Sequence, residues 1–237
     1  MAGGGGLTLK CLRHLEPAGI DVYTSGDHVW DQRVFEQELP QVSNVLRPAN
    51  VSPEQPGRGY DVFTSPGGVP VAVVSLLGRT FMNAGADCPF RAASLIVQQV
   101  RPKARVIVVD FHAEATSEKC ALGRFLDGQV SAVLGTHTHV ATADEKVLPR
   151  GTAYQTDVGM VGAAESILGR AIEPVLRRFS TGMPSRFDVV ETGIVMHATV
   201  LDIDDKTGLA MHIERLRIPD AHGGATGMGS KQGRDGV

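Results

Sequence analysis

The sequence is poor in cysteine, in aromatic residues and in surplus positive charge. It has 237 residues but only three cysteines, too few for a disulfide framework, and this favours a reducing, cytoplasmic setting. Aromatic residues make up 5% of the chain and the formal net charge is −3. Both values argue against the stacking platforms and the basic surface that general nucleic-acid binding requires. No apolar run approaches the ~18 residues of a membrane span, so we expect no membrane-crossing segment.

The remaining composition is typical of a globular protein, because hydrophobic residues make up 42% of the chain. The length fits one large domain, which we expect over residues 1–218. Residues 219–237 are rich in glycine and polar side chains, which predicts a disordered tail. The chain opens on a run of glycines, Gly3 to Gly6, with no basic-then-apolar signal segment before it.

Strand-length apolar runs alternate with helix-length segments along most of the chain, and the last third is rich in strands. The expected strands cover residues 20–24, 60–64, 69–77, 105–111, 130–134, 152–156, 186–190, 194–203 and 209–218. The expected helices cover residues 8–15, 31–39, 91–100, 117–126 and 173–179. This order predicts an α/β domain, and we favour two sheets packed face to face with helices outside.

Four of the eight histidines follow predicted strands. His28 comes after the strand 20–24, His112 comes directly after the strand 105–111, and His137 and His139 follow the strand 130–134. Ligands in open α/β sheets bind at the carboxyl ends of strands. Residues two apart in an extended segment point the same way, so both imidazoles of the pair can face one ion. Together with Asp27, this pattern predicts a metal site that suits Zn, Fe, Mn or Ni.

Longer motifs carry a resemblance to a known family. The segments are residues 25–31 (SGDHVWD), 46–50 (LRPAN), 78–81 (GRTF), 110–119 (DFHAEATSEK), 135–140 (GTHTHV) and 156–160 (TDVGM). With these segments, the chain resembles the YmdB-type branch of the calcineurin-like metallophosphoesterases, whose known activity is the hydrolysis of cyclic nucleotides such as 2′,3′-cyclic AMP. The segments lie in the family's order, and the resemblance covers nearly all of residues 3–218.

The resemblance implies a four-layer α/β/β/α sandwich and a two-metal centre that activates water for attack on phosphorus. Carried over residue by residue, the family pattern assigns Asp27, His112 and His137 to one metal and His139 to the other. It assigns His28 the role of proton donor to the leaving ribose oxygen. The resemblance implies Fe or Mn as the divalent metal, with Zn and Mg as alternatives.

The sequence departs from the family in two places. Asp27 stands where the family has asparagine, which adds a negative charge that favours cations and disfavours an anionic phosphate. The family's first β-α-β piece, with two carboxylate ligands, has no counterpart, so the glycine run at the start corresponds to the loop after it. We therefore expect an N-terminally truncated sandwich with one tightly bound metal instead of two.

Four further residues have two interpretations each. Glu114 and Asp157 either orient the histidine imidazoles or cap loops. Arg47 and Arg79, in loops rich in glycine and proline, either reach the substrate phosphate or lie solvated at the surface. The sequence leaves both alternatives open.

The leading interpretation is a metal-dependent phosphodiesterase that acts on a small-molecule phosphodiester. The alternative is an inactive or weakly active truncated family member, either a regulator or a fragment created by a wrong start codon. An amidohydrolase barrel also binds metal through His-x-His, but there the motif follows the first strand, whereas here it lies past the midpoint. The sequence does not specify a protein partner, and a homo-oligomer stays open.

Overall fold

The computed structural model describes residues 5–82 and 85–220. The chain divides into two compact units, of which the first joins Met1–Met160 to His197–Arg217 and the second joins Val161–Met196 to Ile218–Val237. Every residue predicted to hold the metal lies in the first unit. The predicted tail lies almost wholly outside the described residues, except that its first residue, Pro219, ends a strand.

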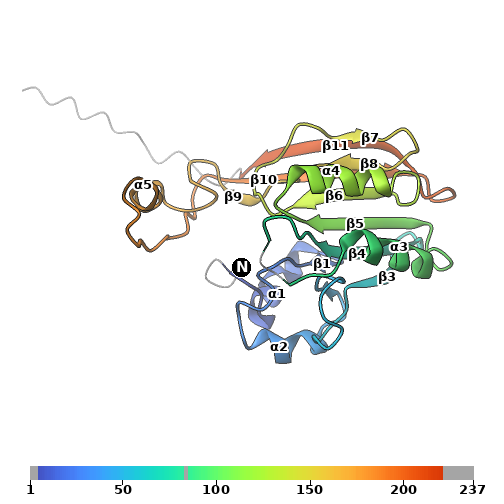
Figure 1. The fold of residues 1–237 in the computed structure, drawn as a ribbon, viewed down its shortest axis with the longest axis horizontal. Coiled ribbons are helices and arrows are strands. Elements are labelled where there is room, and N and C mark those ends of the chain that lie inside the picture. Colours follow the sequence, from blue (N-terminus) through green and yellow to red (C-terminus); the bar gives the residue numbers. More distant parts are fainter. Residues whose placement is uncertain (1–4, 83–84, 221–237) are drawn as a thin grey trace, which may run out of the picture. The chain divides into compact units, whose positions relative to one another are not determined.

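A six-stranded sheet forms the centre of the first unit, in the order β3-β4-β5-β6-β8-β7 (Figure 1). Its central strands β4, β5, β6 and β8 are parallel, and the edge strands β3 and β7 are antiparallel to their neighbours. The parallel pairing places the carboxyl ends of β4, β5 and β6 along one edge. The strands are β3 (Tyr60–Thr64), β4 (Pro70–Leu77), β5 (Val106–His112), β6 (Ala132–Thr136), β7 (Lys146–Val147) and β8 (Ala153–Gln155).

Helices α3 (Pro89–Val100) and α4 (Thr116–Phe125) cover one face of this sheet (Figure 1). Side chains alternate between the two faces of a strand, so β5 sends Ile107, Val109 and Phe111 into the core under these helices. Val108, which lies between Ile107 and Val109, points the other way and packs on the opposite face of the sheet. Asp110 and His112 share that other face because they lie two and four residues from Val108.

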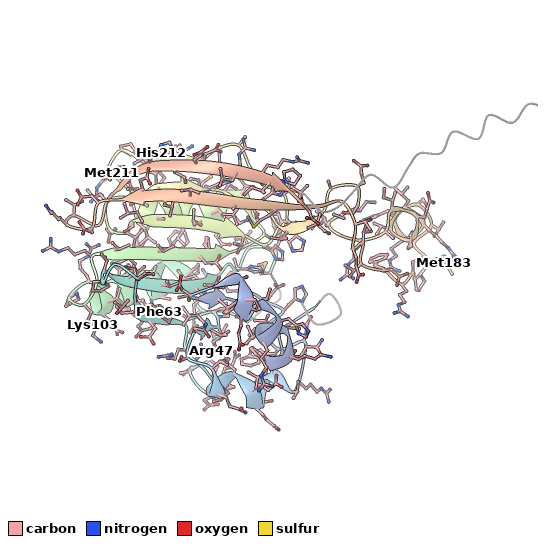
Figure 2. The ribbon with its side chains drawn as sticks, turned by 180° about the vertical axis from the view of Figure 1, so that it is seen from behind. Arg47, Phe63, Lys103, Met183, Met211 and His212 are labelled. Carbon is pink, nitrogen blue, oxygen red and sulfur yellow. The ribbon has the colours of Figure 1, made fainter. Side chains whose placement is uncertain are left out.

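The second face is covered by the hairpin of β10 (Ile194–Ile203) and β11 (Ala210–Pro219). Ala210 and Ile213 of β11 pack against the small side chains of Ala132 and Ala153. Figure 2 shows Met211 on the outer strand, where this side chain is 66% exposed. The helix layer, the six-stranded sheet and this pair of strands are the α/β/β layers of the expected four-layer α/β/β/α sandwich.

The N-terminal part of the first unit has short elements joined by turns. Thr8 caps α1 (Leu9–Leu15), with its hydroxyl oxygen 3.2 Å from the Cys11 amide that donates to it. The expected strand 20–24 shortens to β1 (Tyr23–Thr24), which pairs in parallel with the unpredicted β2 (Val45–Leu46). The expected helix 31–39 is reduced to α2 (Phe35–Glu38), because the preceding residues form turns.

In the second unit, β9 (Val161–Ala163) pairs with the first residues of β10, and α5 (Ile172–Thr181) ends at Gly182 in a left-handed conformation. The strand predicted over residues 186–190 is wrong. Residues 186–190 form only an isolated bridge, between Val189 and Arg170. Arg170 lies in a short loop and not in a strand, so no longer pairing forms. No helix in the described part of the chain is both long and apolar enough to cross a membrane.

Replacing Leu122 of α4 with alanine tests the helix-to-sheet core. Leu122 is fully buried in the same cluster as Phe111 and Tyr154, so Leu122→Ala is expected to lower the free energy of unfolding by about 2–5 kcal/mol. Leu95→Ala on α3 is the control, because Leu95 is 59% exposed and its loss is expected to cost less than about 0.5 kcal/mol. Urea unfolding of both variants measures the difference, and equal losses would contradict the packing described here.

Candidate metal centre

Strand register places the predicted ligands together. Leu77, His112 and Thr136 are neighbours across β4, β5 and β6, so these strands end at the same level. His112 is the last residue of β5, and His137 directly follows β6. Asp27 comes from the loop after β1 and completes the group.

Three ligand atoms of this group converge on one point. His112 Nε2 lies 3.0 Å from Asp27 Oδ1 and 3.1 Å from His137 Nδ1, and the third side of the triangle is 3.7 Å. Metal–ligand bonds of about 2.0–2.2 Å in a tetrahedral site put neighbouring ligand atoms about 3.4 Å apart. The observed spacings bracket that value. A carboxylate with two imidazoles is also a donor set that divalent metals accept, so the residues fit a metal ion.

Glycine at position 26 is required for this convergence. A Cβ added to Gly26 would lie 2.3 Å from His112 Nε2, far inside van der Waals contact. Any side chain there would therefore displace the imidazole or the loop that carries Asp27. The loop is also tied to the sheet, because the Ser75 hydroxyl donates to the Ser25 carbonyl over 3.0 Å.

Local electrostatics keep these groups in the protonation states that bind metal. The hydrogen bond from His112 lowers the pKa of Asp27 to about 2, so this carboxylate is ionised at neutral pH. Burial lowers the pKa of His137 below its ordinary value, and the neighbouring His112 lowers it further. The imidazole of His137 is therefore neutral near pH 7 and has a free lone pair, as a ligand must.

A half-buried pair of hydrogen bonds on the same face of the sheet involves His112. Its Nδ1 lies 3.0 Å from the hydroxyl of Thr136, which in turn donates to Asp110 Oδ1 over 2.7 Å. Because Thr136 donates to the carboxylate, its oxygen accepts from Nδ1. A bound metal would replace the proton through which Nε2 bonds to Asp27. Burial raises the pKa of Asp110. Asp110 and Thr136 were not predicted, although the spacing of two residues between Asp110 and His112 in a strand is a signal for a shared face.

Glu114 contacts the second histidine of the group. Its Oε2 lies 3.1 Å from Nε2 of His137, on the side of the ring away from Nδ1. A carboxylate at one ring nitrogen fixes the tautomer and leaves the other nitrogen as the ligand. Of the two interpretations of Glu114, this contact favours orientation of the imidazole.

The backbone of the His-x-His segment is strained. His137 has a φ of 106° and His139 a φ of 67°, in the left-handed region that costs about 1–3 kcal/mol for a residue other than glycine. Asp157 holds this segment through the residue between them, because its Oδ2 accepts from the Thr138 amide over 3.0 Å. The same oxygen accepts from Lys119 Nζ over 2.8 Å. Lys119 was not predicted as part of the site.

Two other predicted residues lie beside the group. His28 is 64% exposed, its Nδ1 lies 2.9 Å from Asp31 Oδ2, and its Nε2 lies 3.9 Å from Asp27 Oδ2. His139 is not among the three residues whose ligand atoms converge. Burial lowers the pKa of His139, so its imidazole is neutral at pH 7.

The two predicted arginines have different surroundings. Arg47 is buried, and its guanidinium donates to the carbonyls of Gln55, Pro56 and Pro48, so it supports its own loop. Figure 2 shows Arg47 within the N-terminal part of the first unit. Arg79 is exposed, two residues after the end of β4, and its backbone amide donates to Glu118.

Comparisons with known proteins identify a family and similar chains. The family model described as "YmdB-like protein" matches residues 1–216. A Bacillus subtilis protein named 2′,3′-cyclic-nucleotide 2′-phosphodiesterase is 45% identical over 93% of this chain and 83% of its own. A hypothetical protein from Thermus thermophilus superposes with a TM-score of 0.84 at 41% identity, over 92% of this chain and 83% of its own. A structure described as a novel phosphatase from Mycoplasma pneumoniae superposes with the same TM-score at 32% identity, over 92% and 78%.

Enlarging Gly26 by one methyl group tests the convergence of the ligands. Gly26→Ala is expected to weaken Mn²⁺ binding by about tenfold or more, because the added Cβ overlaps the ring of His112. Gly67→Ala is the matched control, since its Cβ meets no atom closer than 3.8 Å. Isothermal titration with Mn²⁺ measures both variants. Wild-type affinity in Gly26→Ala would show that the ligands do not converge as described.

Proposed function

The chain belongs to the YmdB-like protein family, and on that premise we propose that it is a metal-dependent phosphodiesterase that hydrolyses cyclic nucleotides such as 2′,3′-cyclic AMP. The observation that carries this proposal is the convergence of Asp27, His112 and His137 beside an exposed imidazole. The name of the Bacillus subtilis relative supplies the substrate class.

His28 is proposed as the proton donor. Its side chain is exposed to incoming substrate and yet lies within 3.9 Å of a ligand carboxylate, so it borders the reacting centre. In-line attack on phosphorus by water breaks the bond to a ribose oxygen, and that oxygen needs a proton as it leaves. Asp31 contacts Nδ1 of His28, which leaves Nε2 free to deliver the proton.

A divalent cation is proposed to be held by Asp27, His112 and His137. When bound, it lowers the pKa of water and neutralises charge on the phosphoryl oxygens. Fe or Mn is our expectation for its identity, with Zn or Mg as alternatives. Because His139 does not share the three-residue group, we expect one tightly bound ion per chain. The role of Arg79 as a phosphate contact is supported by its exposure next to the end of β4.

The cellular setting is proposed from the cysteines. Cys11, Cys88 and Cys120 are all free thiols, which fits the reducing cytoplasm expected from their low number. The proposed partner is a small phosphodiester, since the site is built from ligand and proton-transfer groups. A homo-oligomer is compatible with this function and is not needed for it.

Activity measurements on the His28→Ala variant test the assigned chemistry. The wild-type protein with added Mn²⁺ is expected to hydrolyse 2′,3′-cyclic AMP, and His28→Ala is expected to lose about 10²–10⁴-fold in kcat. Mn²⁺ affinity is expected to change little, because His28 is outside the converging group. His14→Ala is the control, since His14 is an exposed residue of α1. Full activity in His28→Ala would reject the proton-donor assignment, and no activity in the wild type would favour the inactive alternative.

Counting the bound metal tests the number of sites. After loading with Mn²⁺ and passage over a desalting column, elemental analysis is expected to find about one ion per chain, the number that a three-ligand group can retain. His112→Ala is expected to retain none, because it removes the ligand whose Nε2 lies about 3 Å from each of the other two ligand atoms. Two retained ions per chain would contradict the prediction of a single tight site.

A further inference from the structure

The His137–His139 segment has a conformation that its own residues disfavour. Both histidines have positive φ, a backbone conformation that glycine adopts readily and histidine does not. His137 must nevertheless bring Nδ1 to within 3.1 Å of His112 Nε2 for the ligand group to form. A strained conformation of this kind persists only when surrounding contacts determine it. The question is therefore which contacts hold the segment.

Asp157 supplies the principal contacts. Its Oδ2 accepts from both the amide (3.0 Å) and the hydroxyl (2.8 Å) of Thr138, the residue between the two histidines. Its Oδ1 accepts from the Gly159 amide over 2.9 Å, which fixes the carboxylate in its own loop. Asp157 is fully buried, so these bonds are shielded from competition by water.

Lys119 of α4 completes the arrangement. Its Nζ lies 2.8 Å from Asp157 Oδ2, and the two side chains are 1% and 0% exposed. Gly135 makes room for the lysine, because a Cβ there would lie 3.0 Å from Lys119 Cδ and 1.7 Å from the Thr156 carbonyl oxygen. The ammonium group compensates the buried carboxylate and fixes its position from the helix side.

We propose that the Lys119–Asp157 ion pair is a positioning device for the metal centre, which holds the His137–His139 segment in its ligand conformation through Thr138. Neither residue touches the converging ligand atoms, so both act through another residue. This inference rests on the proposed function for the identity of the ligand group. It adds a link from α4 to that group, so that the helix layer on one face of the sheet determines ligand geometry at its edge.

A purely structural role for the pair would have a different signature. Breaking any buried ion pair destabilises the fold, wherever the pair lies. A positioning role additionally lowers metal affinity in the protein that remains folded. Asp127 offers a matched control, because it is 5% exposed and accepts from the backbone amides of Arg150 (3.1 Å) and Thr152 (3.5 Å). These contacts lie before β8 begins, at the opposite end of the sheet from the ligands.

The experiment compares Mn²⁺ affinity with thermal stability in the full chain. Mn²⁺ affinity is measured by competition with a chromogenic chelator, and the unfolding midpoint is measured without metal. Asp157→Asn and Lys119→Met are expected to lower Mn²⁺ affinity about 10–100-fold, the range seen when partners of metal ligands are removed. Asp127→Asn is expected to lower the unfolding midpoint and to retain wild-type affinity.

Thr138→Val covers the case in which the charge variants do not fold. It removes only the hydroxyl bond to Asp157 and is expected to lower Mn²⁺ affinity about two- to tenfold. Wild-type affinity in folded Asp157→Asn and Thr138→Val would overturn the proposal, as would an equal loss in Asp127→Asn. A wild-type protein that binds no Mn²⁺ would overturn it together with the metal centre. If the wild type binds Mn²⁺ and hydrolyses no cyclic nucleotide, the proposed function fails. The positioning role is still supported in that case if Mn²⁺ affinity falls in Asp157→Asn, Lys119→Met and Thr138→Val and not in Asp127→Asn.

Discussion

The site depends on the register of three parallel strands. Because β4, β5 and β6 end at the same level, His112 and the residue after Thr136 reach the same edge of the sheet. A shift of one residue in β5 would turn His112 and Asp110 into the helix-side core and bring Phe111 to the other face. Burial on both faces opposes such a shift, since Ile107, Val109 and Phe111 fill the core under α3 and α4.

Around this edge, each of the two histidine ligands is held by partners of its own. Thr136, itself bonded to Asp110, hydrogen-bonds to Nδ1 of His112. Glu114 contacts Nε2 of His137. Asp157 accepts a hydrogen bond from Thr138, the residue between His137 and His139. Without a cation, the hydrogen bond between His112 Nε2 and Asp27 Oδ1 joins two of the three ligand atoms, and the surrounding carboxylates and hydroxyls determine how the imidazoles are oriented. The low pKa of Asp27 follows from the same crowding, because the adjacent imidazole hydrogen-bonds to the ionised form.

Much of the fold could be predicted from local sequence pattern. The valine-rich strands β4 and β5, the helices α3 and α4 and the β10–β11 hairpin appear close to their predicted bounds, because alternation and helical periodicity are local signals. The segment 186–190 has the composition of a strand but forms only a bridge, because strand formation requires a partner strand. The short strands β2 and β9 escaped prediction for the converse reason, since pairing and not composition makes them strands.

For the site, the sequence alone determined which chemistry is present: His28, His112, His137 and Asp27 stand after strands, and spacing plus motif indicate a metal centre. Tertiary structure decided which side chains meet. It buried Arg47 among loop carbonyls, kept His139 out of the converging group, and brought in Lys119 and Asp110. The type of a ligand is a property of one residue and can be read from the sequence. Its orientation depends on contacts between residues far apart in the chain, such as the contact between Lys119 and Asp157, which are 38 positions apart.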